Sequence, residues 1–295
     1  MAGFFGFFDY TKPGKGISKD EPPKMGVALY FDILLRRFWK LISLNLLYLI
    51  ASVPAIVIAW FISTYFVTWT ATLAGIDITQ TATTWSMLSV FMTIIFLQVC
   101  GSGPATAAMN YVLRKYVNDT HSWVWSDFID NIKSNFKQGM GAYVVNVLAG
   151  FLLMFGFVFY TYIMQNSVAY IFKFIIIIIT IIFVMMQMYT YQMMAGFKLR
   201  FKHIYKNAFL LTAIKLPWNI LSLAVIIAMM YAVYYLAVSI PIAGILVFGL
   251  LFFTLINFTQ IFMTNNIVKK YILEPFLAQD TENNKDDIEE SSADA

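Results

Sequence analysis

Charged residues are scarce in this sequence: only 12% of its 295 residues are Asp, Glu, Lys or Arg. Soluble domains carry about 25% charged and about 45–50% apolar residues. Here 60% of the residues are hydrophobic and the mean hydropathy is +0.72. A soluble fold of this length could not cover so much apolar surface, so the composition predicts an integral membrane protein.

Residues that carry catalytic or metal chemistry are also few. The chain has one cysteine, Cys100, and two histidines, His121 and His203, which follow no metal-ligand spacing. An intrachain disulfide is therefore impossible, and no metal site is expected. No nucleophile elbow, phosphate-binding loop or dinucleotide fingerprint occurs either. We expect a protein that is not an enzyme and uses no cofactor, and the mild net charge of +4 argues against a nucleic-acid partner.

Long apolar segments replace the missing polar ones. About 20 apolar residues are needed for a helix to cross a bilayer, and only helices satisfy their own backbone in lipid within one segment. Six segments qualify, and the prediction is an all-α polytopic bundle of six transmembrane helices. Their approximate bounds are residues 41–67, 85–112, 140–164, 169–194, 216–237 and 241–268.

The basic residues support this count. In a six-span arrangement, 19 of the 20 Lys and Arg residues fall on one side, and Lys173 alone falls on the other. Because positive charge is retained on the cytoplasmic side, both ends of the chain are expected in the cytoplasm. Adding or removing one span would destroy the asymmetry.

Three segments with basic and aromatic residues precede spans. They cover residues 25–40, 126–137 and 203–215, and each is followed by a span with an early asparagine: Asn45, Asn146 or Asn219. The pattern suggests three helical hairpins, each with an amphipathic lead-in helix at the cytoplasmic face. Chance similarity is the alternative. The chain then divides into a cytoplasmic segment 1–40 with an interfacial helix at about 25–40, a transmembrane domain 41–268 and an acidic tail 269–295, which we expect to be disordered.

Charge is absent from the interior of the predicted spans, which argues against proton-coupled or ion-pumping chemistry. Uncharged polar residues remain as a candidate lining for a polyol or sugar path. Hydrogen bonding between helices is the simpler alternative. The candidates are Asn45, Gln98, Asn146, Gln187 and Asn219, with Gln192, Asn257 and Gln260 as further polar positions.

The stretch from Cys100 to Ala108, CGSGPATAA, is the most distinctive part of the sequence. Gly101 and Ala105 have the spacing that lets helices approach closely, and Gly103-Pro104 should bend the helix. The stretch could form a hinge beside a binding cavity or a tight packing contact with a static kink. Transporters with discontinuous helices usually have a matched pair of such segments, and the sequence shows only one.

A second distinctive stretch follows this span. Arg114, Trp123, Trp125 and Asp127 form a candidate partner surface in the next loop, since Trp and Arg are common interface anchors. The alternative is an ordinary set of interfacial aromatics with a helix cap.

Four motifs, GFFDYTKPGKGISKD, FWKLISLNLLYLI, GSGPATAAMNYVLRKY and HSWVWSDF, resemble the YesL-like family of bacterial membrane proteins. The family is classed as a domain of unknown function, so the resemblance implies a class and no catalytic residues. Its members often lie beside genes for polysaccharide breakdown and sugar permeases, which implies a link to carbohydrate uptake. We therefore expect an accessory component that contacts the lipid bilayer and sugar-importer permease subunits. A transporter of a small neutral solute and a membrane sensor are the alternatives.

Overall fold

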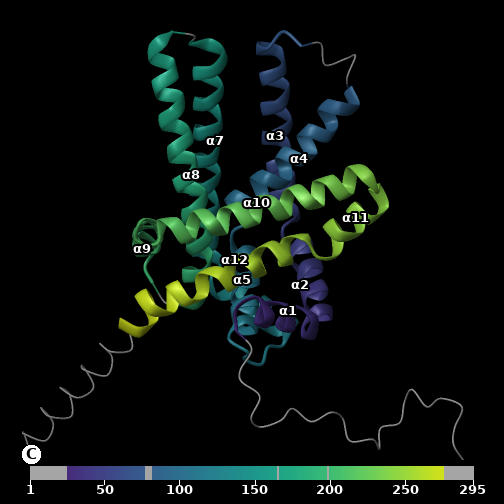
Figure 1. Cartoon of the computed structure of the whole chain (residues 1–295), viewed down its shortest axis with the longest axis vertical. Coiled ribbons are helices and arrows are strands. Elements are labelled where there is room, and N and C mark those ends of the chain that lie inside the picture. Colours follow the sequence, from purple (N-terminus) through teal and green to yellow (C-terminus); the bar gives the residue numbers. More distant parts are fainter. Residues whose placement is uncertain (1–24, 77–81, 165, 198, 276–295) are drawn as a thin grey trace, which may run out of the picture. The chain divides into compact units, whose positions relative to one another are not determined.

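The computed structural model describes residues 25–76, 82–164, 166–197 and 199–275, and all regular structure in these ranges is helical (Figure 1). The predicted all-α class is confirmed. The helices are α1 (Gly26–Arg36), α2 (Phe38–Ala51), α3 (Val53–Leu73), α4 (Ala82–Cys100), α5 (Pro104–Val117), α6 (Val124–Ser134), α7 (Phe136–Val158), η2 (Phe159–Ile163), α8 (Ser167–Gly196), α9 (Phe201–Ile214), α10 (Leu216–Ser239), α11 (Pro241–Leu250), α12 (Phe252–Val268) and η3 (Lys269–Leu273).

Residues 1–36 and 37–295 form two separate compact units. The described part of the first unit is α1, which falls inside the predicted lead-in segment 25–40 and ends at Arg36. The aromatic residues at 1–10 and the acidic residues at 280–295 lie outside the described residues.

Within the described ranges, four helical segments are long and apolar enough to cross a membrane: α3, α7 with η2, α8 and α10. Two bent pairs raise the count to six if each pair is one span. The helices α4 and α5 meet at 68°, and α11 with α12–η3 bends by 58°. The predicted polytopic bundle is therefore confirmed, with four to six candidate spans. The segment predicted as one first span is divided at Ser52 into α2 and α3.

Consecutive helices pack in three pairs. The helices α3 and α4, α7 and α8, and α10 and α11 contact each other in turn, and Figure 1 shows α7 and α8 side by side. We call the helices α2 to α5 hairpin 1, the helices α7 and α8 hairpin 2, and the helices α10 to α12 hairpin 3. Their outward faces are apolar and exposed, for example at Ile178 of α8 and Leu152 of α7, which suits a surface in contact with lipid.

The core is built from the last helix of each hairpin. The helix α5, residues 185–194 of α8, and α12 contact one another and are almost wholly buried. Met109, Met193 and Phe258 are all 0% exposed. Polar residues alternate with these apolar ones, so this core is richer in amide and hydroxyl groups than the outward faces.

A short helix precedes the first long helix of hairpins 2 and 3. The helix α6 ends before Asn135, and α9 ends before Lys215; in both cases the next helix begins one residue later. In hairpin 1, Arg37 likewise separates α1 from α2. The three predicted lead-in segments are thus all helical, while their position at a membrane surface stays a prediction.

Candidate functional site

Helical structure is interrupted between α4 and α5, at the distinctive Gly-rich stretch. Gly101 and Gly103 have φ values of +73° and +68°, which are accessible to glycine at little cost. Pro104 is the first residue of α5, where its missing N–H removes no helical hydrogen bond. The sequence predicted a bend here, and the structure places a complete break there, with only residues 101–103 outside the two helices.

Close packing occurs at the same place. A Cβ atom on Gly103 would stand 2.9 Å from the carbonyl oxygen of Gly139, and one on Gly139 would stand 2.7 Å from the nitrogen of Pro104. Ala105, next in the chain, is 2% exposed. The break and the tight packing contact therefore occur at the same place, and the function of the stretch as a hinge stays a prediction.

Asn146 of α7 binds the end of α4 across this break. Its Nδ2 atom donates to the carbonyl oxygen of Cys100 at 3.2 Å, which also accepts from the Tyr191 hydroxyl at 2.7 Å. Asn146 exchanges hydrogen bonds of 2.9 and 3.1 Å with Gln187 and accepts from the Tyr205 hydroxyl at 2.9 Å. A helix carbonyl left without a partner by the break is thereby satisfied inside the protein.

A second break separates α11 from α12 at Leu251. Asn45 binds both sides of it: Nδ2 donates to the carbonyl oxygen of Gly249 at 2.8 Å, and Oδ1 accepts from the backbone N–H of Thr254 at 3.1 Å. The expectation of a single broken helix is therefore wrong. The sequence around Leu251 gave little local signal because the residue that satisfies the break lies about 200 positions earlier.

Asn219 is the third member of the set. It donates to the carbonyl oxygens of Leu211 and Thr212 at the end of α9, both at 3.1 Å, and it accepts from the Tyr189 hydroxyl of α8. Each of the three asparagines is 0% exposed. Asn45 joins hairpin 1 to hairpin 3, Asn146 joins hairpin 2 to hairpin 1, and Asn219 joins hairpin 3 to hairpin 2. This cyclic order favours a threefold repeat over chance, with α8 as the one unbroken copy.

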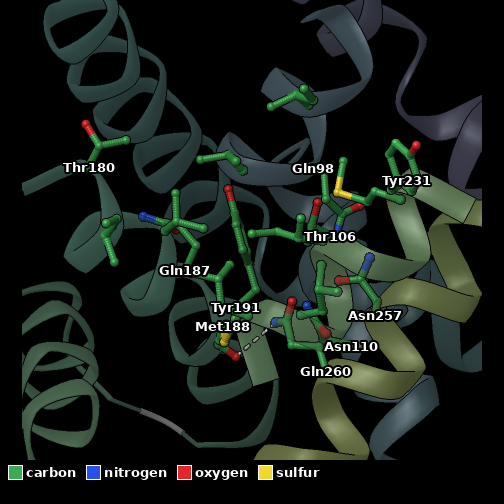
Figure 2. Close-up of a pocket in the computed structure, with 18 of the residues that line it drawn as sticks. Gln98, Thr106, Asn110, Thr180, Gln187, Met188, Tyr191, Tyr231, Asn257 and Gln260 are labelled. Atoms are coloured by element: carbon green, nitrogen blue, oxygen red, sulfur yellow. Dashed lines mark hydrogen bonds between the residues drawn. The ribbon is translucent and has the colours of Figure 1, made fainter. Parts of the chain in front are cut away.

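A cavity of about 400 Å³ lies among α4, α5, α8, α10 and α12. We call it the amide cavity, because side-chain amides supply most of its polar lining. Those amides belong to Gln98, Asn110, Gln187, Asn257 and Gln260. Figure 2 shows Thr106, Asn110, Asn257 and Gln260 close together, with Thr180 at a distance from them on α8. The remaining wall is apolar and includes Ile226 and Met230 of α10.

Some polar groups of this cavity have no hydrogen-bond partner among the described residues. Gln98 makes no hydrogen bond to another described residue, and Oδ1 of Asn110 is buried without one. Gln260 uses its Nε2 to reach the carbonyl oxygen of Met188 at 3.0 Å, and Asn257 uses its Nδ2 on the carbonyl oxygen of Phe253 at 2.8 Å. Their amide oxygens stay available. No carboxylate, amine, guanidinium or imidazole belongs to the described lining, so the cavity suits an uncharged ligand.

The predicted polar residues separate into two groups. Gln98 and Gln187 line the amide cavity, as do Asn257 and Gln260. The three asparagines Asn45, Asn146 and Asn219 do not, because their amides are used by backbone groups at helix ends. Asn146 does not line the cavity but donates hydrogen bonds to two residues that do, Gln187 and Tyr191. Asn110 also lines the cavity, but the sequence did not single it out; it lies in α5, the helix that follows the Gly-rich stretch.

The candidate partner surface is also divided. Arg114 is turned inward: its guanidinium lies 4.7 Å from the ring centroid of Phe197 and so close to Gly196 that no Cβ could fit there. Trp123 and Trp125 are 70% and 67% exposed. Only the two tryptophans therefore remain accessible as a surface.

The Asp127 carboxylate is bonded to neighbouring residues of the same chain segment. Its Oδ2 accepts from the Ser122 hydroxyl at 2.7 Å, the Trp123 backbone N–H at 3.0 Å and the Lys115 ammonium at 3.0 Å. Burial raises the pKa of this carboxyl, but these donors lower it by more, so the pKa lies below its usual range. Asp127 thus holds α6 against the end of α5, and its bonded oxygen is already used within the protein.

This geometry predicts a pH dependence. A carboxyl whose folded pKa is depressed stabilises the fold above its unfolded pKa of about 3.9, and this contribution is lost as the pH falls through the folded value. Asp127→Asn should therefore unfold at a lower temperature than the parent near neutral pH, and the difference should shrink as the pH is lowered below about 4. Thermal unfolding followed at a series of pH values checks this. A difference that stays constant down to about pH 3 would contradict the assigned role.

No group of three or more His, Cys, Asp or Glu residues that could hold a metal ion occurs among the described residues. The one free thiol, that of Cys100, is buried and donates to the carbonyl oxygen of Asn146 at 3.4 Å.

Residues 82–157 match the family described as "Protein of unknown function, DUF624", and this range holds the α4–α5 break together with Asn146. The chain is similar to the uncharacterized protein YteU of Bacillus subtilis (strain 168), at 26% identity over 161 residues, which cover 53% of this chain and 70% of YteU. No solved structure matches. The resemblance to a family of unknown function is thus confirmed, and the matched residues run from α4 into α7.

Proposed function

We propose that this protein binds a small, uncharged, hydroxyl-bearing solute in the amide cavity and that it serves carbohydrate uptake without transforming its ligand. The observation that carries the proposal is the chemistry of the cavity. Its polar groups are amides and hydroxyls without formal charge. Among the described residues, Gln98 has no hydrogen-bond partner, and Oδ1 of Asn110 is buried without one. Amides both donate and accept hydrogen bonds, as sugar hydroxyls do.

The position of the cavity supports passage as well as binding. Both α5 and α12 line it, and each begins immediately after a break. Matched pairs of broken helices are typical of transporters that bind their substrate between helices. The basic residues support a place in the cell membrane with both chain ends in the cytoplasm.

Gln98→Leu tests the proposal, because it removes an unpaired amide and keeps the size of the side chain. We expect affinity for the bound solute to fall about tenfold, or ~1.4 kcal/mol. The measurement is the ligand-induced rise in unfolding temperature of the purified protein in lipid nanodiscs, with glucose, maltose and glycerol as probes and glucuronic acid as the charged comparison.

The matched control is Gln138→Leu. Gln138 lies away from the amide cavity and donates to the carbonyl oxygen of Leu199 at 3.1 Å, so this variant should keep the parent affinity. A protein that responds to glucuronic acid as strongly as to glucose, or to none of the neutral probes, would contradict the proposal.

An accessory role is the second candidate, and the exposed pair Trp123 and Trp125 favours it. Aromatic residues of this kind anchor protein interfaces, and permease subunits of a sugar importer are the partners that the family resemblance suggests. Affinity capture in mild detergent of the parent and of a Trp123→Ala, Trp125→Ala double variant separates the two. Loss of captured permease subunits in the double variant would support this role, and capture of none by the parent would count against it.

A further inference from the structure

A second cavity adjoins the amide cavity. It has a volume of about 540 Å³ and lies between hairpins 1 and 2, lined by residues of α3, α4, α7 and α8. We call it the apolar cavity, since its lining consists mostly of Phe, Ile, Leu, Val and Met side chains.

The few polar side chains in the apolar cavity are those of Thr70, Cys100 and Thr180 and that of Tyr162 in η2, which is 38% exposed. The Thr70 hydroxyl donates to the carbonyl oxygen of Val67 at 2.8 Å, and the Thr180 hydroxyl donates to that of Ile176 at 2.8 Å. The Cys100 thiol is bonded to Asn146. Apolar cavities without free polar groups stay dry, so this space suits hydrocarbon.

The two cavities share part of their walls. Five residues line both: Ile95 and Val99 of α4, and Thr180, Ile181 and Val184 of α8. Each set recurs at helical spacing, so the seam between α4 and α8 has the amide cavity on one side and the apolar cavity on the other. A ligand at this seam would meet several amides at one end and mostly apolar side chains at the other.

The apolar cavity also has exposed residues in its lining. Ile177 is 36% exposed, Phe157 is 40% exposed and Ile181 is 42% exposed. In a membrane these positions would contact lipid, so the cavity is accessible from the bilayer. Both volumes fall within the range of about 300–1,000 Å³ that is usual for ligand sites.

We infer that the two cavities together take one amphiphile, with an uncharged hydroxyl-rich head in the amide cavity and a single hydrocarbon chain in the apolar cavity. This inference rests on the proposed function for the head-binding half. It adds that the ligand enters laterally from the bilayer, through the apolar cavity and past the α4–α8 seam. A hydrocarbon chain leaves no polar group unsatisfied in the apolar cavity, whereas a second sugar unit would.

The test uses a photoreactive alkyl glucoside with a diazirine at the end of its chain, irradiated with the protein in nanodiscs. Peptide mapping should find the label on lining residues of the apolar cavity. Ile177→Trp, which fills that cavity from its exposed edge, should lower this labelling about tenfold, as for a loss of ~1.4 kcal/mol. Ile178→Trp is the matched control, because Ile178 is 57% exposed and lines neither cavity; its labelling should equal that of the parent.

The head is tested separately. Labelling should fall in Gln98→Leu, and a diazirine-bearing alcohol of equal chain length without the sugar should label weakly. Equal labelling by that alcohol would mean that the cavity holds only bilayer hydrocarbon, and would overturn the inference. If free glucose raises the unfolding temperature but the chain labels no apolar-cavity residue, the inference fails and the proposed function stands. If glucose also has no effect, both fail.

Discussion

Asn146→Leu is expected to lower the free energy of unfolding by about 3–5 kcal/mol, at the upper end of the range for single substitutions. The change removes every side-chain hydrogen bond that Asn146 makes. Both ends of the buried Gln187 amide would lose their partner, and the Tyr205 hydroxyl would keep only the carbonyl oxygen of Ala142 at 3.4 Å. Each buried polar group left without a partner costs about 1–3 kcal/mol.

Unfolding of the purified protein in detergent, followed by circular dichroism against temperature or denaturant, measures this loss. Asn257→Leu is the control, since its amide donates only to the carbonyl oxygen of Phe253 in its own helix. That variant should unfold close to the parent while it weakens solute binding. Equal destabilisation by the two variants would show that the bonds across the break carry no special weight.

Gly103→Ala is expected to be as severe, with a loss of about 3–4 kcal/mol or failure to accumulate in the membrane. With φ +68° and ψ −120°, Gly103 has a backbone conformation that residues with a Cβ atom rarely adopt. The added methyl would also meet the carbonyl oxygen of Gly139 at 2.9 Å. The contact can be relieved only by moving α5 away from α7, and the backbone strain would remain.

Gly249→Ala provides the comparison. A Cβ atom at this position meets nothing within 4 Å, and its φ is not positive. The variant should be neutral or about 0.5–1 kcal/mol more stable, because alanine favours a helix over glycine. The yield of folded protein on gel filtration and the unfolding midpoint measure both variants. Similar behaviour of the two would mean that the break does not depend on glycine.

Much of the architecture follows from local pattern. Apolar runs of bilayer length located all the long helices, and Gly101-Ser102-Gly103-Pro104 located the first break because glycine and proline act on the backbone where they stand. The short helices α6 and α9 were predicted from their amphipathic spacing. These features depend on residues close together in the sequence.

The second break shows the limit of this reasoning. Leu251 is an ordinary residue, and the break is stabilised by Asn45 of a different hairpin. Arg114 is a similar case, since its loop-like sequence gave no sign that Gly196 and Phe197 would enclose it. Such contacts join positions that only the folded chain brings together.

The candidate site was predicted in part for the same reason. Gln98 and Gln187 were recognised because a polar residue in an apolar run is conspicuous, and they do line the amide cavity. The sequence could not show that Asn146 spends its amide on the carbonyl of Cys100 while Asn110 keeps an oxygen free. The number of free hydrogen-bonding groups depends on backbone breaks, and these were only half visible.

Equilibrium binding of radiolabelled glucose and glucuronic acid to the purified protein in nanodiscs tests the central claim most directly, which is that an uncharged amide cavity selects an uncharged hydroxyl-bearing ligand. The account predicts saturable binding of glucose at one site per chain, weaker in Gln98→Leu, and no saturable binding of glucuronic acid. Equal binding of the two compounds, or glucose binding that Gln98→Leu leaves unchanged, would contradict it.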